Sequence, residues 1–470
     1  MGTSRPYRSH GRSKGDNVTS ETFTNRYLVA GNYAPLQEET TTSSLPVTGE
    51  LPRELNGRYL RIGPNPRGDV DPATHHWFNG AGMVHGIRLR EGKAEWYRSR
   101  FVESERGAPN TNVLSHAGRI LTLIEAGRPP VEISPDLDRM AIWDCDGALS
   151  RGFTAHPKVD PVTGDLHAIT YNPRHSSLRY VVLGADGAAR HSSDIDVDDG
   201  PMVHDMALTE SRVVVLDLPV TLAAARRLAQ GGGPLTRLPL TWDDRHPARI
   251  GILPIDGTAA QVRWIEAPRC FVFHVLNAFD NADGSLTMDV IRYDRMFVRD
   301  VWGPSDSEPT LVRWTVNTDR GSVNEEVISE YRVEFPRVDP ALTGRAHRYG
   351  WFAGFSAHGL MITDDVERDP TDGFGTGPLV KVDTRTGDTT VHDYGPGRVT
   401  MEPAFVPRRD AVCEDDGWIL SVVHDAHAGR AELVVLDAAD LGAAPVARVH
   451  LPHRVPFGFH GNWIDDNDLA

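Results

Sequence analysis

The chain has 470 residues, of which 40% are hydrophobic and 24% charged, and its formal net charge is -16. This composition is typical of a globular protein with a large core and excludes global disorder, and the acidic balance argues against a nucleic-acid partner because its field repels phosphates. Only three cysteines occur, without a CxxC pair, which disfavours a disulfide framework or a thiolate zinc site and predicts a reducing, cytoplasmic location.

The first 22 residues are predicted to form a flexible tail. They carry basic side chains among Gly and Ser, and no apolar segment of the kind found in a signal peptide follows them. No stretch approaches the roughly 18 consecutive apolar residues that a membrane-spanning helix needs. The remaining residues could form two packed domains or one large β unit, and we expect no part of them to cross a bilayer.

Short segments rich in β-branched and apolar residues recur along the chain, each closed by Gly, Asp, Asn or Pro. Two connections, 160–165 and 383–388, place a glycine where a tight hairpin needs a positive φ. These patterns predict strands, the clearest being Gly118–Glu125, Arg179–Leu183, Arg212–Leu218, Leu286–Tyr293 and Glu432–Asp437.

Helical periodicity is rare. The best case is Thr221–Gln230, which Gly231–Pro234 would end abruptly. Many short strands with hardly any helices predict an all-β fold, either a sandwich, a barrel or a propeller. About seven units of about 60 residues would fit the length, which favours a propeller over a double sandwich, although no signature recurs at a fixed period.

Four of the twenty histidines lie in apolar or glycine-containing surroundings: His156, His204, His274 and His460. A buried imidazole must find a partner, and the glycines beside His460 would let the backbone approach another group closely. Taken singly, each is more often a hydrogen-bonded core histidine than a metal ligand. His424 and His427 bracket Asp425 and Ala426 in a predicted turn, where a solvated surface role is expected rather than a second metal site.

The segments around these histidines resemble the motifs of the carotenoid cleavage oxygenases. The resemblance begins with Gly57–Pro66 and His76–His85 and continues, in the family's order, through residues 277–279, 334–337, 402–408, 414–418 and 458–463. It implies that residues 23–470 form a single domain, a seven-bladed β-propeller with a dome of loops and short helices over a substrate tunnel. It also implies one Fe(II) ion on the propeller axis, with His156, His204, His274 and His460 as its ligands.

The same resemblance assigns Glu125, Glu334 and Glu402 as partners of the ligating histidines. A carboxylate that accepts the free N–H of an imidazole fixes its tautomer and its orientation. Without the motifs, these glutamates would be interpreted as surface charges or as ion-pair partners of an arginine such as Arg337 or Arg408.

The activity implied by the resemblance is that of a non-haem dioxygenase. With O2 as co-substrate, such an enzyme splits a conjugated carbon-carbon double bond into two carbonyl products, without an organic cofactor or a catalytic side chain beyond the metal centre. Four neutral imidazoles leave room for dioxygen on the metal, but histidines alone do not select iron over copper, nickel or zinc.

The substrate is predicted from the side chains expected to line the tunnel: Phe101, Ile124 and Phe279. The stilbene-cleaving branch of the family carries a Lys directly before the first glutamate and a Tyr ahead of a valine, where this chain has Ile124 and Phe101. Apolar residues suit a carotenoid or apocarotenoid and would leave a phenolate unpaired. A 4-hydroxystilbene or alkenyl phenol is the alternative, and a non-catalytic propeller that only binds a partner is a second one.

An apolar small molecule is therefore the expected partner, with the oligomeric state left open. The segment Pro219–Trp242 mixes apolar residues with Arg226, Arg227 and Arg237. This mixture is typical of a peripheral membrane anchor, and an ordinary helix of the dome is the alternative.

Overall fold

The computed structural model describes residues 31–71, 75–103, 108–172, 177–223, 240–298, 306–354 and 377–469. The predicted tail and most of the predicted helix Thr221–Gln230 lie outside these ranges, so the domain boundary at residue 23 stays a prediction. Ala223 is helical, two residues after the predicted start, because Thr221 lies in strand β16 (Val220–Thr221), which pairs with β17 (Thr241–Trp242).

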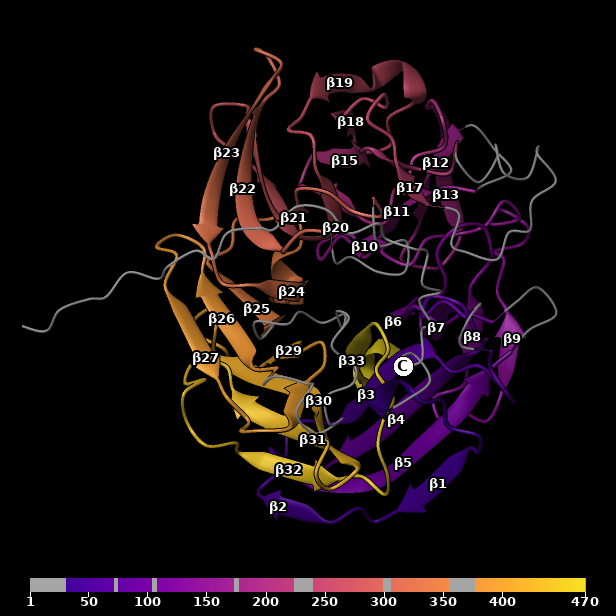
Figure 1. Ribbon diagram of the computed structural model, residues 1–470, viewed down its shortest axis with the longest axis vertical. Helices are drawn as coiled ribbons and strands as arrows, with labels where there is room; N and C mark the ends of the chain where they lie inside the picture. Colours follow the sequence, from indigo (N-terminus) through magenta and orange to yellow (C-terminus); the bar gives the residue numbers. More distant parts are fainter. Residues whose placement is uncertain are drawn as a thin grey trace, which may run out of the picture.

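Seven antiparallel sheets stand around a common axis in the described part of the chain, as the blades of a β-propeller (Figure 1). Blade 1 comprises β1 (Thr40–Ser43), β3 (Gly57–Pro64), β4 (Gly82–Arg90), β5 (Lys93–Val102) and β33 (Gly461–Asp465). Blade 2 comprises β6 (Asn112–His116), β7 (Arg119–Leu123), β8 (Val131–Ile133) and β9 (Met140–Ile142). Blade 3 comprises β10 (Lys158–Val159), β11 (Leu166–Thr170), β12 (Ser177–Leu183) and β13 (Ala189–Asp196).

The remaining blades follow in chain order. Blade 4 comprises β14 (Met206–Leu208), β15 (Arg212–Asp217), β18 (Arg249–Pro254) and β19 (Arg263–Glu266). Blade 5 comprises β20 (Phe271–Asp280), β21 (Leu286–Tyr293), β22 (Thr310–Asn317) and β23 (Ser322–Ser329). Blade 6 comprises β24 (Val333–Arg337), β25 (Tyr349–Gly354), β26 (Leu379–Asp383) and β27 (Thr389–His392). Blade 7 comprises β28 (Arg398–Thr400), β29 (Ala404–Pro407), β30 (Gly417–Asp425), β31 (Arg430–Asp437), β32 (Ala447–His450) and β2 (Val47–Gly49).

Apart from the helical Ala223, the helical elements of the described residues are short 3₁₀ turns: η2 (Gly31–Tyr33), η3 (Ala259–Gln261), η4 (Pro340–Leu342) and η5 (Asp466–Leu469). None of the helices in the described ranges has the length and hydropathy needed to span a bilayer.

The ring is closed by strands that are far apart in the sequence. β33 adds to blade 1 by pairing with β3, in a register that sets Gly461 opposite Arg61 and Asp465 opposite Gly57. On the other side of the junction, β2 pairs with β32 and so extends blade 7. This exchange ties both end regions of the described chain into the propeller and pairs the inner edge of β3.

The strands and turns follow the sequence pattern closely. Each of the five predicted strands coincides with a strand of the structure to within two residues at either end. Both predicted hairpin glycines have a positive φ, 74° at Gly164 and 78° at Gly387. The all-β propeller prediction is confirmed, and the sandwich alternative is wrong because the sheets stand around an axis rather than face to face.

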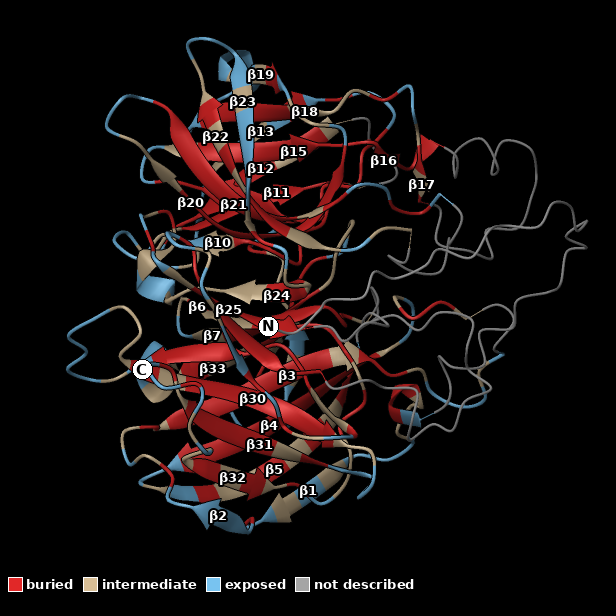
Figure 2. Ribbon diagram, turned by 60° about the vertical axis from the view of Figure 1, so that its left-hand side comes forward, coloured by how far each residue is buried: buried red, intermediate tan, exposed pale blue. Residues whose placement is uncertain are grey.

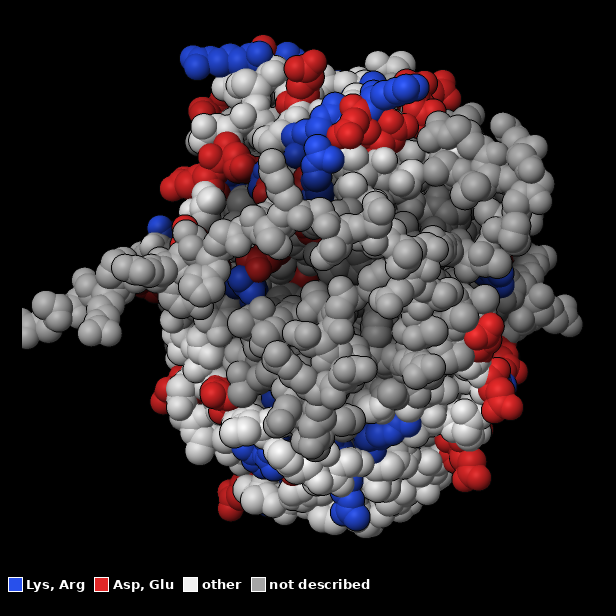
Figure 3. Space-filling model, viewed as in Figure 1, with Lys and Arg blue, Asp and Glu red and all other residues white. Residues whose placement is uncertain are grey.

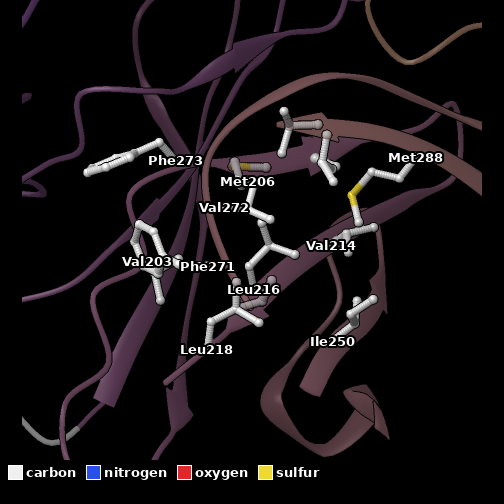
Figure 4. Packing of buried hydrophobic residues seen from close by; sticks show 14 of the residues in the cluster. Val203, Met206, Val214, Leu216, Leu218, Ile250, Phe271, Val272, Phe273 and Met288 are labelled. Atoms are coloured by element: carbon white, nitrogen blue, oxygen red, sulfur yellow. The ribbon is translucent and has the colours of Figure 1, made fainter. Parts of the chain in front are cut away.

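Buried residues occupy most of the inner strands, and exposed residues gather on the outermost strands (Figure 2). The largest cluster joins blades 3 to 6. Figure 4 shows part of it, where Val214 and Leu216 of β15 and Met206 of β14 pack near Val272 of β20 and Met288 of β21. Burial of each such side chain contributes about 1.5–3 kcal/mol, so the inner strands are held rigidly around the axis.

Acidic and basic side chains are intermixed around the rim of the face shown in Figure 3. Several form ion pairs between neighbouring strands or blades, such as Arg190 with Asp165 and Asp256. Exposed pairs of this kind contribute little to stability, so the fold depends on the packing between blades.

Candidate metal centre

Each blade delivers one residue to the axis of the propeller. Four blades supply a histidine: His460 lies before β33 of blade 1, His156 before β10 of blade 3, His204 before β14 of blade 4, and His274 within β20 of blade 5. The other three blades supply a glutamate: Glu125 follows β7 of blade 2, Glu334 lies in β24 of blade 6, and Glu402 lies between β28 and β29 of blade 7. The seven predicted residues are therefore brought together by the ring itself.

The four histidines converge. One nitrogen of each imidazole lies within 4.8 Å of those of the others, and all four residues are buried. The His156 ring centroid lies 4.5 Å from that of His204, 4.5 Å from that of His460 and 5.0 Å from that of His274. An ion about 2.1 Å from each nitrogen would need separations of up to about 4.2 Å, so a small closure of the rings is enough to hold one.

Three of the imidazoles are aimed by carboxylates. Glu125 lies 2.5 Å from Nδ1 of His204, Glu334 lies 2.5 Å from Nδ1 of His274, and Glu402 lies 2.9 Å from Nδ1 of His460. Because Nδ1 is engaged in each of these pairs, Nε2 is the atom that is left to face the centre. His156 has no carboxylate partner among the described residues.

Buried tyrosines complete two of these contacts. The Tyr171 hydroxyl donates to Glu125, and the Tyr293 hydroxyl donates to Glu334 over 2.9 Å. Burial, and then the neighbouring carboxylate, raise the pKa of both phenols well above the usual value. Both therefore stay protonated and act as donors.

The third glutamate is held by a cation. Glu402 accepts from the Arg337 guanidinium over 2.9 Å and from the Gly461 amide over 2.7 Å. Burial would raise the pKa of Glu402, but Arg337 and His460 outweigh it and lower this pKa to about 2. The arginine interpretation of this glutamate was thus also correct, since Glu402 pairs with Arg337 as well as with His460. Arg408 instead pairs with Asp416 and Asp437.

Local backbone features direct these side chains. The pairing of β20 with β21 is irregular on both sides of His274, between Val272 and Val275 and between Val275 and Asn277, and such bulges re-aim a side chain. Beside His460, a Cβ added to Gly458 would lie 2.7 Å from Cα of Gly63. The predicted close approach of the backbone at this glycine is therefore confirmed.

The electrostatics favour neutral ligands at two positions. Burial, and then the neighbouring imidazoles, lower the pKa of His156 well below its usual value. Burial lowers the pKa of His460 to about 4, although Glu402 opposes the shift. At His274, burial is outweighed by the Glu334 carboxylate, which raises the pKa.

The donor set fits a transition-metal ion. Nε2 of His156 and Nε2 of His274 are buried without a hydrogen-bond partner among the described residues, which is costly unless another group binds them. Imidazole nitrogens suit Fe, Zn, Cu and Ni. We call these four histidines the histidine layer.

An apolar cavity of about 240 Å³ lies on one side of the histidine layer. It is lined by His204, His274 and His460 together with residues that precede the ligands or their carboxylate partners along the inner strands, such as Ile124, Phe273 and Phe459. The other described lining residues are Trp77, Phe78, Asn79, Asn110, Thr111, Glu125, Tyr171, Met202, Leu222, Leu240, Tyr293, Glu334 and Phe335. We call this space the apolar cavity.

A second space of about 220 Å³ lies on the other side of the layer. It is lined by His156, His274 and His460 and by residues that follow the ligands along the same strands, including Lys158, Asp205 and Asn462. Val159 and Pro340 are exposed members of its wall, so it reaches the surface. We call this space the polar chamber.

The predicted tunnel residues are only partly brought together. Ile124 lines the apolar cavity, directly before Glu125. Phe101 does not line it and lies instead beneath the Arg67 guanidinium, 3.7 Å from the ring centroid. Phe279 does not line it either, because five residues of extended strand separate it from His274, about 17 Å, and its ring packs against His347.

Sequence reasoning missed several residues around the layer. Tyr171, Tyr293 and Asp205 were not singled out, although Asp205 directly follows a predicted ligand. Expecting His424 to be solvated was wrong, because it lies in β30 with 5% of its surface exposed and packs against Phe457.

Comparisons with known proteins agree with this arrangement. The family model described as retinal pigment epithelial membrane protein matches residues 33–108 and 104–465. The carotenoid cleavage oxygenase of Mycobacterium tuberculosis is 41% identical over 93% of this chain and 97% of its own. The crystal structure of the lignostilbene dioxygenase of Pseudomonas brassicacearum superimposes with a TM-score of 0.83 at 29% identity, covering 93% of this chain and 98% of that one. A mutant Synechocystis apocarotenoid oxygenase gives 0.80 at 26% identity, covering 95% and 100%.

Proposed function

The chain belongs to the retinal pigment epithelial membrane protein family, which includes the carotenoid cleavage oxygenases, and from this premise we propose that it cleaves a conjugated carbon-carbon double bond of a carotenoid or apocarotenoid. Membership makes it an oxidoreductase of the dioxygenase type, so a non-catalytic binding propeller is not retained as an alternative. The proposed products are two carbonyl compounds that contain both atoms of O2.

The proposed metal is one iron(II) ion per subunit, held by His156, His204, His274 and His460. Bound iron(II) supplies the redox chemistry that lets dioxygen react with an alkene. The chain itself orients the ligands and keeps water away from the substrate. Glu125, Glu334 and Glu402 fix the imidazoles, and the apolar cavity excludes water from the reacting bond.

The observation that carries the substrate proposal is the wall of the apolar cavity. Ile124 lies beside Glu125 on this wall, and the described lining residues include no lysine or arginine. A hydrocarbon polyene gains from such a wall through apolar burial, whereas a phenolate would stay buried without a cation.

Cleavage of a 4-hydroxystilbene or alkenyl phenol is the second candidate. It is favoured by the structural similarity to the lignostilbene dioxygenase and by the neutral polar side chains Asn79, Asn110 and Thr111 on the cavity wall. These could bind a neutral phenol but could not compensate the charge of a phenolate.

Iron-loaded protein should be assayed with an apocarotenoid and with a 4-hydroxystilbene, following loss of the conjugated absorbance and the masses of the products under labelled dioxygen. We expect apocarotenoid cleavage with one labelled oxygen atom in each product. The His204→Ala variant is the matched control that should leave both substrates intact. Cleavage of the stilbene alone would overturn the polyene proposal, and unlabelled products would overturn the dioxygenase scheme.

Because the proposed substrate is apolar, it would reside in lipid, and the enzyme would have to extract it from there. We keep the proposal that Pro219–Trp242 contacts a membrane surface from a cytoplasmic location, although residues 224–239 lie outside the described ranges. Flotation with liposomes tests it, since a protein that stays at the bottom of the gradient lacks such an anchor.

A further inference from the structure

His156 is the exception in the histidine layer. The other three imidazoles are fixed at Nδ1 by glutamates, while no described carboxylate contacts His156. The strand that follows it, β10, is only two residues long and makes two residue pairs with β11. Such a short strand holds the orientation of the preceding His156 poorly, so the position of His156 needs another support.

That support is found in the wall of the polar chamber. Lys158, two residues after His156, places its ammonium 2.8 Å from Oδ1 and 3.1 Å from Oδ2 of Asp205. Only 2% of the Asp205 side chain is exposed, against 21% for Lys158. A hydrogen-bonded pair with one partner so deeply buried is stronger than a surface ion pair.

Asp205 is bound from two further directions. Its Oδ2 accepts from the Val275 amide over 2.9 Å, next to His274, and its Oδ1 accepts from the Met206 amide over 2.7 Å. Asp205 itself directly follows His204. One carboxylate thus connects the segments that carry His156, His204 and His274, across blades 3, 4 and 5.

We propose that Asp205 is a positioning residue of the metal centre, which fastens three of the four histidine segments and, through Lys158, replaces the carboxylate that His156 lacks. The inference rests on the proposed metal site but not on the proposed substrate. Asp205 acts on the metal only through the segments it holds, and its negative charge is needed because Lys158 is its partner.

The matched control is Asp289 in β21 of blade 5. Its side chain is also fully buried and pairs with Arg313 over 2.7 Å and with His347 over 3.1 Å, but it connects none of the histidine segments. Loss of charge at Asp289 should therefore destabilise the fold in a similar way without changing the metal site.

The test titrates metal-free protein with Co(II), whose visible spectrum reports ligand geometry, at a temperature where each variant is folded. We expect Lys158→Met to shift the spectrum and weaken Co(II) binding about 10-fold, Asp205→Asn to weaken it more, and the double variant to be no weaker than Asp205→Asn. Asp289→Asn should keep the native spectrum and affinity. No substrate is present, so failure of the polyene proposal leaves this result intact.

The proposal is overturned if Lys158→Met binds Co(II) with native spectrum and affinity. It is equally overturned if Asp205→Asn and Asp289→Asn change affinity by the same factor. Lys158 is the more accessible partner, so its variant gives a result even if Asp205→Asn does not fold.

Discussion

The apolar cavity and the polar chamber share a wall but differ in chemistry. Their volumes are nearly equal, about 240 and 220 Å³, and His274 and His460 line both. The first is surrounded by aromatic and aliphatic side chains, the second by Lys158, Asp205 and Arg337 among others. In the segments that carry His204, His274 and His460, residues before the histidine line the cavity and residues after it line the chamber. Substrate selection is thus assigned to the cavity, whereas support of the ligands is shared, with Glu125 and Glu334 on the cavity side and Glu402 on the chamber side.

The largest expected effect comes from breaking the layer that separates the two spaces. His204 lines only the cavity and His156 only the chamber. Replacing either by alanine removes one of four ligands, so we expect metal affinity to fall at least about 100-fold in both variants. Added imidazole should restore binding better in His156→Ala, because the chamber is the polar side. Equal restoration in the two variants would contradict the difference between the spaces.

A second pair of variants fills one space at a time. Ile124→Trp places a large ring in the cavity, and we expect kcat/KM for the polyene to fall at least about 10-fold, since a 1 Å displacement of substrate is costly. Leu114→Trp places the same ring in the chamber wall and should change kcat/KM less than about twofold. Steady-state kinetics, with the metal content of each variant quantified, measures both values of kcat/KM. Equal losses of kcat/KM in the two variants would mean that substrate occupies both spaces.

A third pair compares the partners of two glutamates. Arg337→Met, on the chamber side, leaves Glu402 buried without its cation and should lower the free energy of unfolding by about 2 kcal/mol. Tyr293→Phe, on the cavity side, removes one hydrogen bond from Glu334 and should cost about 1 kcal/mol. Urea unfolding of the metal-free variants measures both values. A larger loss for Tyr293→Phe would contradict the expectation that an unpaired buried carboxylate costs more than one missing hydrogen bond.

The smallest expected effect is on the pH dependence of stability and concerns His424, a buried histidine outside the histidine layer. Burial lowers the pKa of His424 to about 4, against about 6.5 in the unfolded chain. Because the unfolded state binds the proton first, the stability contributed by neutral His424 is present above pH 6.5 and is lost as the pH falls towards 4. Between pH 8 and pH 6, His424→Leu should lose ~0.8 kcal/mol less than the native chain in urea unfolding. An unchanged pH dependence would contradict the neutral state of His424.

The sequence predicted the strands well because each carries its own alternation and closing turn. The site was predicted through the ordered motifs, and not from composition, since His156 and the buried non-ligand His424 are both isolated imidazoles in apolar surroundings. Phe279 could not be placed correctly, because a motif fixes sequence position but not the distance along a radial strand. The role of Asp205 escaped detection because its three partners belong to three blades, and contacts of that range leave no local pattern.

The closure of blade 1 also determines when the four histidines can come together during synthesis of the chain. His460 reaches the axis only when residues 461–465 pair with β3. The other three histidines have all been synthesised once the chain reaches residue 274. While the nascent chain is still being translated, it therefore holds at most three ligands in an open ring. Coordination of a metal ion by all four histidines therefore requires the closed ring and cannot precede the synthesis of His460.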